Sequence, residues 1–184
     1  MENIDMTTTD YKINQHANHL FQVAQEILVA KPEKAEKLLV KAIGLYFHVY
    51  RTRRENTPTN PRVSNPLYNI ANCYTYYYNI TKDKFYLELA ENMLRQAIKV
   101  RENLGDIDSI HISRMKGNLG EVLSLQERID EALPLLLDNV NQHIEKIGYD
   151  EDTMVALRMY EHAGLKSDKA DEINVFISEK MKHF

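Results

Sequence analysis

The stretch Asn118–Leu135, NLGEVLSLQERIDEALPL, contains two helical patterns separated by a short polar turn. Before the turn, Leu119, Val122 and Leu123 follow the three- and four-residue spacing of one helix face. A second face of the same kind begins at Ala132. Two amphipathic helices joined by so short a turn usually fold back on each other, so this stretch predicts an antiparallel helical hairpin.

The same pattern occurs earlier in the chain. Ala90–Ile98, AENMLRQAI, aligns with Ala132–Val140, ALPLLLDNV, at an offset of 42 residues (from 90 to 132). The preceding helix, Asn69–Tyr74, aligns with Asn118–Leu123 at an offset of 49 (from 69 to 118), so the earlier unit is seven residues longer. Seven residues are about two helical turns, which keeps the faces in phase. A period of this length is typical of stacked repeats.

Helical spacing continues along most of the chain. We expect a single domain over residues 1–184, built from four antiparallel pairs at 11–54, 66–104, 109–147 and 151–182. Their helices are expected at 11–30, 33–54, 66–81, 85–104, 109–126, 130–147, 151–164 and 168–182. The proline-containing segment 55–66 is expected to be a long loop.

Single residues mark several of these boundaries. The expected helix N-caps are Asp83, Asp108 and Asp130, because a carboxylate can accept hydrogen bonds from free backbone amides. The expected C-terminal stops are Gly105 and Gly148, because glycine adopts the left-handed conformation at low cost.

Composition narrows the class of protein. The chain has 184 residues, 43% of them hydrophobic, with too few glycines and prolines (6 and 5) for a loop-rich or all-β protein. A net charge of −4 argues against a nucleic-acid partner. One cysteine, Cys73, excludes an intramolecular disulfide. The N-terminal sequence does not resemble a signal peptide and no apolar run could span a bilayer, so we expect a cytoplasmic protein without membrane contact.

Asn118–Leu135 resembles the tetratricopeptide repeat, in the 42-residue variety of kinesin light chains and many bacterial proteins. The resemblance is closest over residues 66–148 and weaker in the first and last pairs. Glu127 departs from it, because a glycine is usual at that turn position. The resemblance implies an all-α fold, a right-handed α-solenoid of about four helix pairs, whose first helices line a peptide-binding groove.

The groove positions that the resemblance implies come from three units. They are Asn18, Gln22 and Gln25; Asn65, Asn69, Asn72 and Tyr76; and Arg114, Asn118 and Glu121. Asn69 and Asn118 coincide with the asparagine of the family pattern, and an amide can both donate to and accept from a peptide backbone. The same asparagines could instead only bridge adjacent helices. Phe21 stands where the first lysine of a carboxylate clamp would be, so a binder of partner C-termini is not expected.

Two local features have both a functional and a structural interpretation. The run Tyr74–Tyr78 could anchor a bound peptide or simply pack inside the longer helix pair. The basic cluster Arg51, Arg53, Arg54 and Arg62 could receive an acidic partner, or only complement the C-terminal end of a helix.

No pattern in the sequence indicates catalysis, a metal or a cofactor. His16 and His19 have no further ligand at helical spacing, and Cys73 lies on the packed side of its helix. We therefore expect an adaptor or scaffold that binds a protein or peptide in its groove, with a homodimer left open. The alternatives are a secretion-type chaperone, a regulatory sensor, or a structural subunit of a larger assembly. An exposed apolar face on the last helix, made of Ile173, Val175, Phe176, Ile177 and Met181, would favour the subunit or the dimer.

Overall fold

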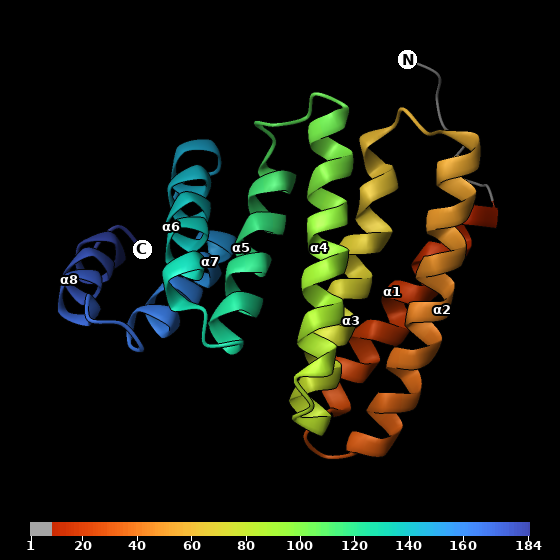
Figure 1. The fold of residues 1–184 in the computed structure, drawn as a ribbon, viewed down its shortest axis with the longest axis horizontal. Coiled ribbons are helices and arrows are strands. Elements are labelled where there is room, and N and C mark those ends of the chain that lie inside the picture. Colours follow the sequence, from red (N-terminus) through yellow and green to blue (C-terminus); the bar gives the residue numbers. More distant parts are fainter. Residues whose placement is uncertain (1–8) are drawn as a thin grey trace. The chain divides into compact units, whose positions relative to one another are not determined.

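The computed structural model describes residues 9–184, and these contain eight α-helices, one short 3-10 helix and no strand. The start of the expected polar N-terminus, residues 1–8, lies outside the described part. The chain divides into two compact units, unit 1 up to Gly105 and unit 2 from Asp106. Figure 1 shows that each unit consists of helices packed side by side. The predicted all-α fold is confirmed.

Unit 1 contains two helix pairs and the 3-10 helix. The first pair is α1 (Thr9–Ile27) with α2 (Pro32–Asn56), and the second is α3 (Asn65–Thr81) with α4 (Phe85–Asn103). α3 also packs against α2, so the two pairs share one core. Small residues allow the close approach of α1 and α2, since Ala17, Ala24, Ala35 and Ala42 are all fully buried.

Unit 2 contains the remaining helices. α5 (Ile110–Leu125) packs on α6 (Ile129–Lys146), and α7 (Glu151–Gly164) packs on α5, on α6 and on α8 (Ala170–Met181). Gly117 and Gly120 lie where α5 meets α6. A β-carbon at Gly120 would come within 2.7 Å of the Leu136 side chain and within 3.1 Å of the Ala132 carbonyl oxygen. Glycine is therefore required at Gly120 for the close contact of these helices.

The segment 55–66 differs from the expected long loop. The polypeptide is irregular only between Asn56 and Pro61, because Pro61–Ser64 forms a 3-10 helix that leads directly into α3. The Asn60 side chain accepts a hydrogen bond from the backbone N–H of Arg62, and this caps the short helix. Asn60 followed by Pro61 is a helix-start signal that the loop assignment overlooked.

Two of the expected caps are wrong and one is partly right. Ser109, not Asp108, caps α5, because its hydroxyl accepts from the Ile112 amide, and Asp130 lies inside the first turn of α6. Asp83 does accept from the Phe85 amide at 3.0 Å, one residue before the N-cap position. The predicted stops are confirmed, since Gly105 and Gly148 have φ of 74° and 94°.

Candidate functional site

The predicted groove residues of unit 1 lie along α1 and α3. The Asn18 carbonyl oxygen accepts a hydrogen bond from the Tyr46 hydroxyl at 2.8 Å and a longer one from the Asn69 amide at 3.5 Å. The rings of Phe21 and Tyr76 meet edge to face, with centroids 5.4 Å apart. The structure thus brings together Asn18 with Asn69, and Tyr76 with Phe21, where α1 and α3 meet. Asn69 remains partly exposed beside this contact.

The other predicted residues of unit 1 are placed differently. The Asn65 side chain accepts from the guanidinium of Arg101 at 2.8 Å, so it is engaged with α4 at the end of the 3-10 helix. Gln22 and Gln25 are exposed on α1, and Gln22 donates to Glu26 one turn further on. Asn72 is half-buried and has partners within the chain.

The tyrosine run is largely part of the core of unit 1. Tyr77 is buried and its hydroxyl donates to the Glu36 carboxylate of α2 at 2.5 Å, while its ring lies 4.3 Å from that of Tyr86. Tyr74 and Tyr76 pack against the same core cluster. Tyr78 is half-buried, with the Lys82 ammonium 5.5 Å from the centre of its ring. Packing accounts for most of the run.

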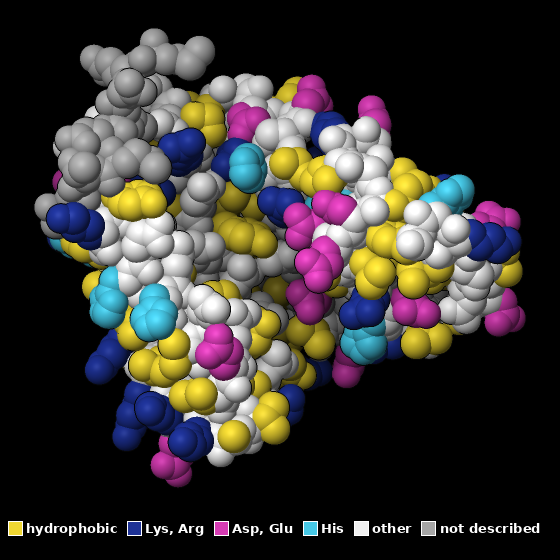
Figure 2. Space-filling view, turned by 180° about the vertical axis from the view of Figure 1, so that it is seen from behind, with side chains coloured by type: hydrophobic (Ala, Val, Ile, Leu, Met, Phe, Trp, Pro, Cys, Tyr) yellow, Lys and Arg dark blue, Asp and Glu magenta, His cyan; other side chains and the backbone are white. Residues whose placement is uncertain are grey.

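Basic residues gather at both ends of α2. In the expected arginine cluster, Arg53 pairs with Asp10 at 3.0 Å and donates to the Arg62 carbonyl, so it holds the chain together locally. Figure 2 shows Lys and Arg side chains at the opposite end of unit 1, where α1 turns into α2. The exposed lysines of the two turns and helix starts in unit 1 are Lys31, Lys34, Lys37, Lys82 and Lys84.

In unit 2 the predicted groove residues lie on α5, toward α7. Arg114 forms an ion pair with Asp152 of α7. Asn118 is half-buried and has partners within the chain. Glu121 is largely buried, and burial raises the pKa of its carboxyl group above the ordinary value. Among the described residues, no hydrogen bond or ion pair compensates the Glu121 carboxylate.

Glu121 lines a pocket of about 330 Å³ between α5 and α7. We call it the α5/α7 pocket, and its lining residues are Glu121, Ser124, Val155, Arg158, Met159 and His162. The Ser124 hydroxyl oxygen is buried and has no hydrogen-bond partner within residues 9–184. Buried polar groups are nearly always paired, so the unpaired Ser124 oxygen beside the Glu121 carboxylate indicates a place for an external partner.

Only Glu121 of this pocket was predicted from the sequence. No groove residue was predicted in the last helix pair, because the repeat pattern there is degenerate. A signal was nevertheless present: Glu151, Val155, Arg158 and His162 follow the 4-3-4 spacing that the predicted positions Asn65, Asn69, Asn72 and Tyr76 follow on α3. Extending the groove register into α7 would have found Val155, Arg158 and His162.

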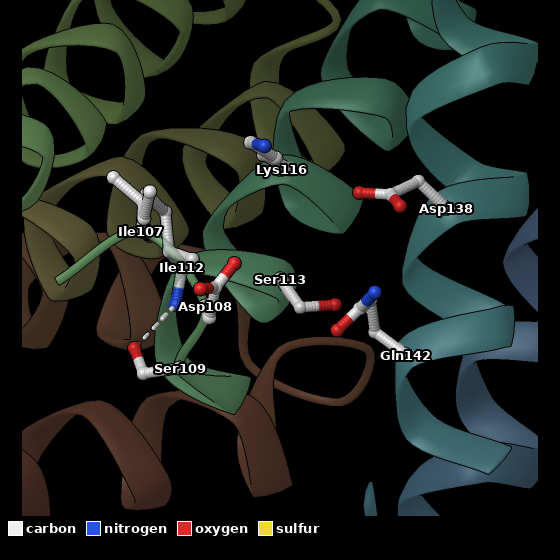
Figure 3. A pocket seen from close by; sticks show the side chains of 8 residues that line it. All are labelled: Ile107, Asp108, Ser109, Ile112, Ser113, Lys116, Asp138 and Gln142. Carbon is white, nitrogen blue, oxygen red and sulfur yellow. Dashed lines mark hydrogen bonds between the residues drawn. The ribbon is translucent and has the colours of Figure 1, made fainter. Parts of the chain in front are cut away.

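A second, smaller pocket of about 130 Å³ lies between α5 and α6. Figure 3 shows the side chains of Ser113 and Gln142 pointing toward one another across it. Three of its six polar residues have structural roles. Ser113 donates to Asn139, Ser109 caps α5, and the Asp108 carbonyl accepts from Lys146. This pocket is therefore a consequence of how α5 starts against α6.

Several kinds of site are not found in residues 9–184. No group of three or more His, Cys, Asp or Glu side chains is placed to hold a metal ion. No helix of this part is long and apolar enough to cross a bilayer. Cys73 is fully buried, and burial raises the pKa of its thiol, which disfavours the reactive thiolate.

The comparisons with known proteins support the fold. No protein-family model matches the sequence, and no curated protein matches it. Among solved structures, the chain is similar to BtubC (BKLC) from P. vanneervenii, with a TM-score of 0.65 and 13% sequence identity. The match covers 96% of this chain and 75% of that protein. At this identity the likeness shows a tetratricopeptide-like helical repeat fold.

Proposed function

We propose that this chain is a non-catalytic adaptor that binds a segment of a partner protein along the first helices of its repeats. The observation that carries the proposal is the α5/α7 pocket, in which the Glu121 carboxylate and the Ser124 hydroxyl have no partner among the described residues. An unpaired buried group costs free energy in the unbound protein. A partner that supplies the missing hydrogen bonds recovers that cost on binding.

Unit 1 offers a complementary kind of contact. Asn69 presents an amide on the partly exposed surface beside Asn18, next to the Phe21 and Tyr76 rings. Amides and aromatic rings together suit a peptide, since the amide pairs with the backbone and the rings pack against side chains. Tetratricopeptide-like folds generally mediate protein–protein interactions, which agrees with this use of the surface.

The test is a comparison of proteins captured from lysate by the wild type and by the Asn69→Ala/Asn118→Ala variant, read by mass spectrometry. A matched control is Asn92→Ala/Asn141→Ala, which removes one exposed amide per unit from the second helices α4 and α6. We expect a partner retained by the wild type and the control and lost by the first variant. Circular dichroism must show that all three proteins keep the same helix content.

Two outcomes contradict the proposal. If the first variant and the control lose the partner equally, the loss reflects general destabilisation and not contact with α3 and α5. If neither variant loses it, the partner binds another surface. The identity of the captured partner would distinguish an adaptor from a chaperone or a sensor. It would also test the expected cytoplasmic location.

Self-association is a second candidate, and the exposed apolar residues near the C-terminus favour it. Val175, Leu165 and Met181 are 61%, 61% and 42% exposed. The face is smaller than the sequence suggested, because Ile173 and Ile177 are buried and Phe176 packs on Tyr160. Light scattering at two protein concentrations tests self-association by measuring the molar mass in solution. The mass of a monomer at both concentrations would exclude self-association.

A further inference from the structure

The α5/α7 pocket has a chemical character that selects among ligands. Its inner polar groups, Glu121 and Ser124, come from α5 and are largely or fully buried. Its other lining residues come from α7, and of these Val155 and Met159 are apolar. Val155, Arg158 and His162 are exposed, so these three residues lie at its opening.

The charges of these groups are not balanced inside the protein. Within residues 9–184 the Glu121 carboxylate has no cationic partner, and the Arg158 guanidinium makes a weak contact with the Met154 sulfur at 3.5 Å. Removing a carboxylate from water without pairing it is unfavourable, and a cation placed against it reverses most of that cost. The ligand atom closest to Glu121 should therefore carry a positive charge.

The walls of the pocket suit the stem of a long basic side chain. Lysine and arginine have aliphatic stems that pack on apolar surface while the charged end reaches a polar group. Here the stem would lie against Val155 and Met159, with the charged end at Glu121 and, after rotation of its hydroxyl, at Ser124. The Ser124 oxygen can accept the remaining N–H of an ammonium or guanidinium.

The opening limits how many basic residues the ligand can carry. The Arg158 guanidinium would repel a second cation beside the first, and it would attract a carboxylate or a backbone carbonyl. We propose that the α5/α7 pocket binds a single lysine or arginine side chain of the partner segment, with Glu121 as its counter-ion. This inference rests on the proposed function and names the residue type that the surface recognises.

The experiment uses small probes on the full chain. Butylguanidinium and butylammonium reproduce the two basic side chains, butyrate reproduces an acidic ligand, and n-butanol is the neutral control. Binding is followed at neutral pH by the ¹³C-methyl resonance of Met159 and the backbone amides of Glu121 and Ser124. We expect saturable shifts with the two cations, and weaker binding or none with the other probes.

Three substitutions decide the role of each charge. Glu121→Gln should weaken the binding of both cations by more than about tenfold, because glutamine keeps the shape of the side chain and removes its charge. Glu145→Gln, an exposed acid on α6, is the matched control and should change nothing. Arg158→Glu should tighten the binding of both cations, because a positive charge at the opening is replaced by a negative one.

The results separate this inference from the proposed function. Equal binding of n-butanol, tighter binding of butyrate, or unchanged binding of the cations to Glu121→Gln would each overturn the inference. In those cases capture of a partner that depends on Asn69 and Asn118 would leave the proposed function standing. Conversely, cations that bind through Glu121 in a protein that captures no partner would support the pocket and contradict the adaptor.

Discussion

At the scale of single residues, the proposed binding group Glu121 is expected to lower the stability of the unbound protein. Its carboxyl group is largely buried and has no partner within residues 9–184, and burial raises its pKa. A carboxyl group with a raised pKa in the folded state binds a proton more readily there than in the unfolded chain. The folded state is therefore favoured at low pH, and this contribution is lost as the pH rises above about 4.3, the usual pKa of glutamate.

Replacing Glu121 by glutamine should stabilise the protein and weaken its function. We expect Glu121→Gln to raise the free energy of unfolding at pH 7 by about 1 kcal/mol, because the unpaired charge is removed. The difference from the wild type should shrink toward zero as the pH falls below about 4.3, where Glu121 is protonated in both states. Urea unfolding of both proteins between pH 4 and pH 8 measures this. A glutamine variant less stable than the wild type at pH 7 would contradict the account.

At the scale of the helix pair, glycine determines how closely α5 and α6 approach. Gly120→Ala places a β-carbon 2.7 Å from Leu136 and 3.1 Å from a backbone oxygen, so the helices must separate. We expect a loss of about 1–3 kcal/mol in the free energy of unfolding. Gly44→Ala is the control: nothing lies within 4 Å of its β-carbon in α2, and alanine favours a helix by about 1 kcal/mol there. The midpoint of thermal unfolding should fall for Gly120→Ala and rise for Gly44→Ala. An unchanged midpoint for Gly120→Ala would mean that α6 repacks easily.

The turn between α5 and α6 contains a residue in an unfavourable conformation. Glu127 has φ of 68°, in the left-handed region that residues other than glycine rarely adopt. The Glu127 side chain is exposed, and we expect Glu127→Gly to stabilise the turn by up to about 1 kcal/mol. Glycine adopts the left-handed conformation without strain, and this gain should exceed the conformational entropy that glycine adds to the unfolded chain. Gln126→Gly, at φ of −83° one residue earlier, should instead be neutral or destabilising. Chemical unfolding of the two variants distinguishes them, and equal effects would show that the φ of Glu127 is not a source of strain.

Hydrophobic periodicity allowed the helices to be predicted from the sequence, because it depends only on local spacing. The expected helix ends differ from those observed by at most three residues, at Ile27 of α1. The departure of Glu127 from the repeat pattern also pointed to the residue that adopts a positive φ.

The site was harder to predict, because side-chain partners are chosen in three dimensions. The ion pair of Arg114 with Asp152 and the hydrogen bond of Asn65 to Arg101 join residues 38 and 36 positions apart. Nothing in the local spacing of the sequence indicates either pair. The α5/α7 pocket was missed for a different reason, since four of its six lining residues lie on α7, a helix that follows the repeat only loosely.

At the scale of the whole molecule, unit 1 contains a buried hydrophobic cluster. Its buried cluster lies on α1, α2 and α3, with Tyr86 and Met93 of α4 packed against it. The cluster consists of Ala17, Ala24, Ala35, Leu39, Ala42, Tyr46, Ile70, Cys73 and Tyr77. Arg101, near the end of α4, is 2% exposed and donates to Ser64 at 2.9 Å and to Asn65 at 2.8 Å. The last turn of α4 therefore fixes the start of α3.

These contacts predict that a fragment of residues 1–105 folds by itself, whereas a fragment of residues 1–100 is less stable. The longer fragment keeps the core and the Arg101 contacts, so its far-UV circular dichroism should remain helical and disappear in one cooperative urea transition. The shorter fragment lacks Arg101 and leaves Ser64 and Asn65 without it, which should lower the free energy of unfolding by about 2 kcal/mol. A non-cooperative transition in the longer fragment would mean that unit 1 needs its neighbour, as repeats often do. Equal midpoints for the two fragments would mean that the Arg101 contacts add no stability, and the core alone would then hold unit 1 together.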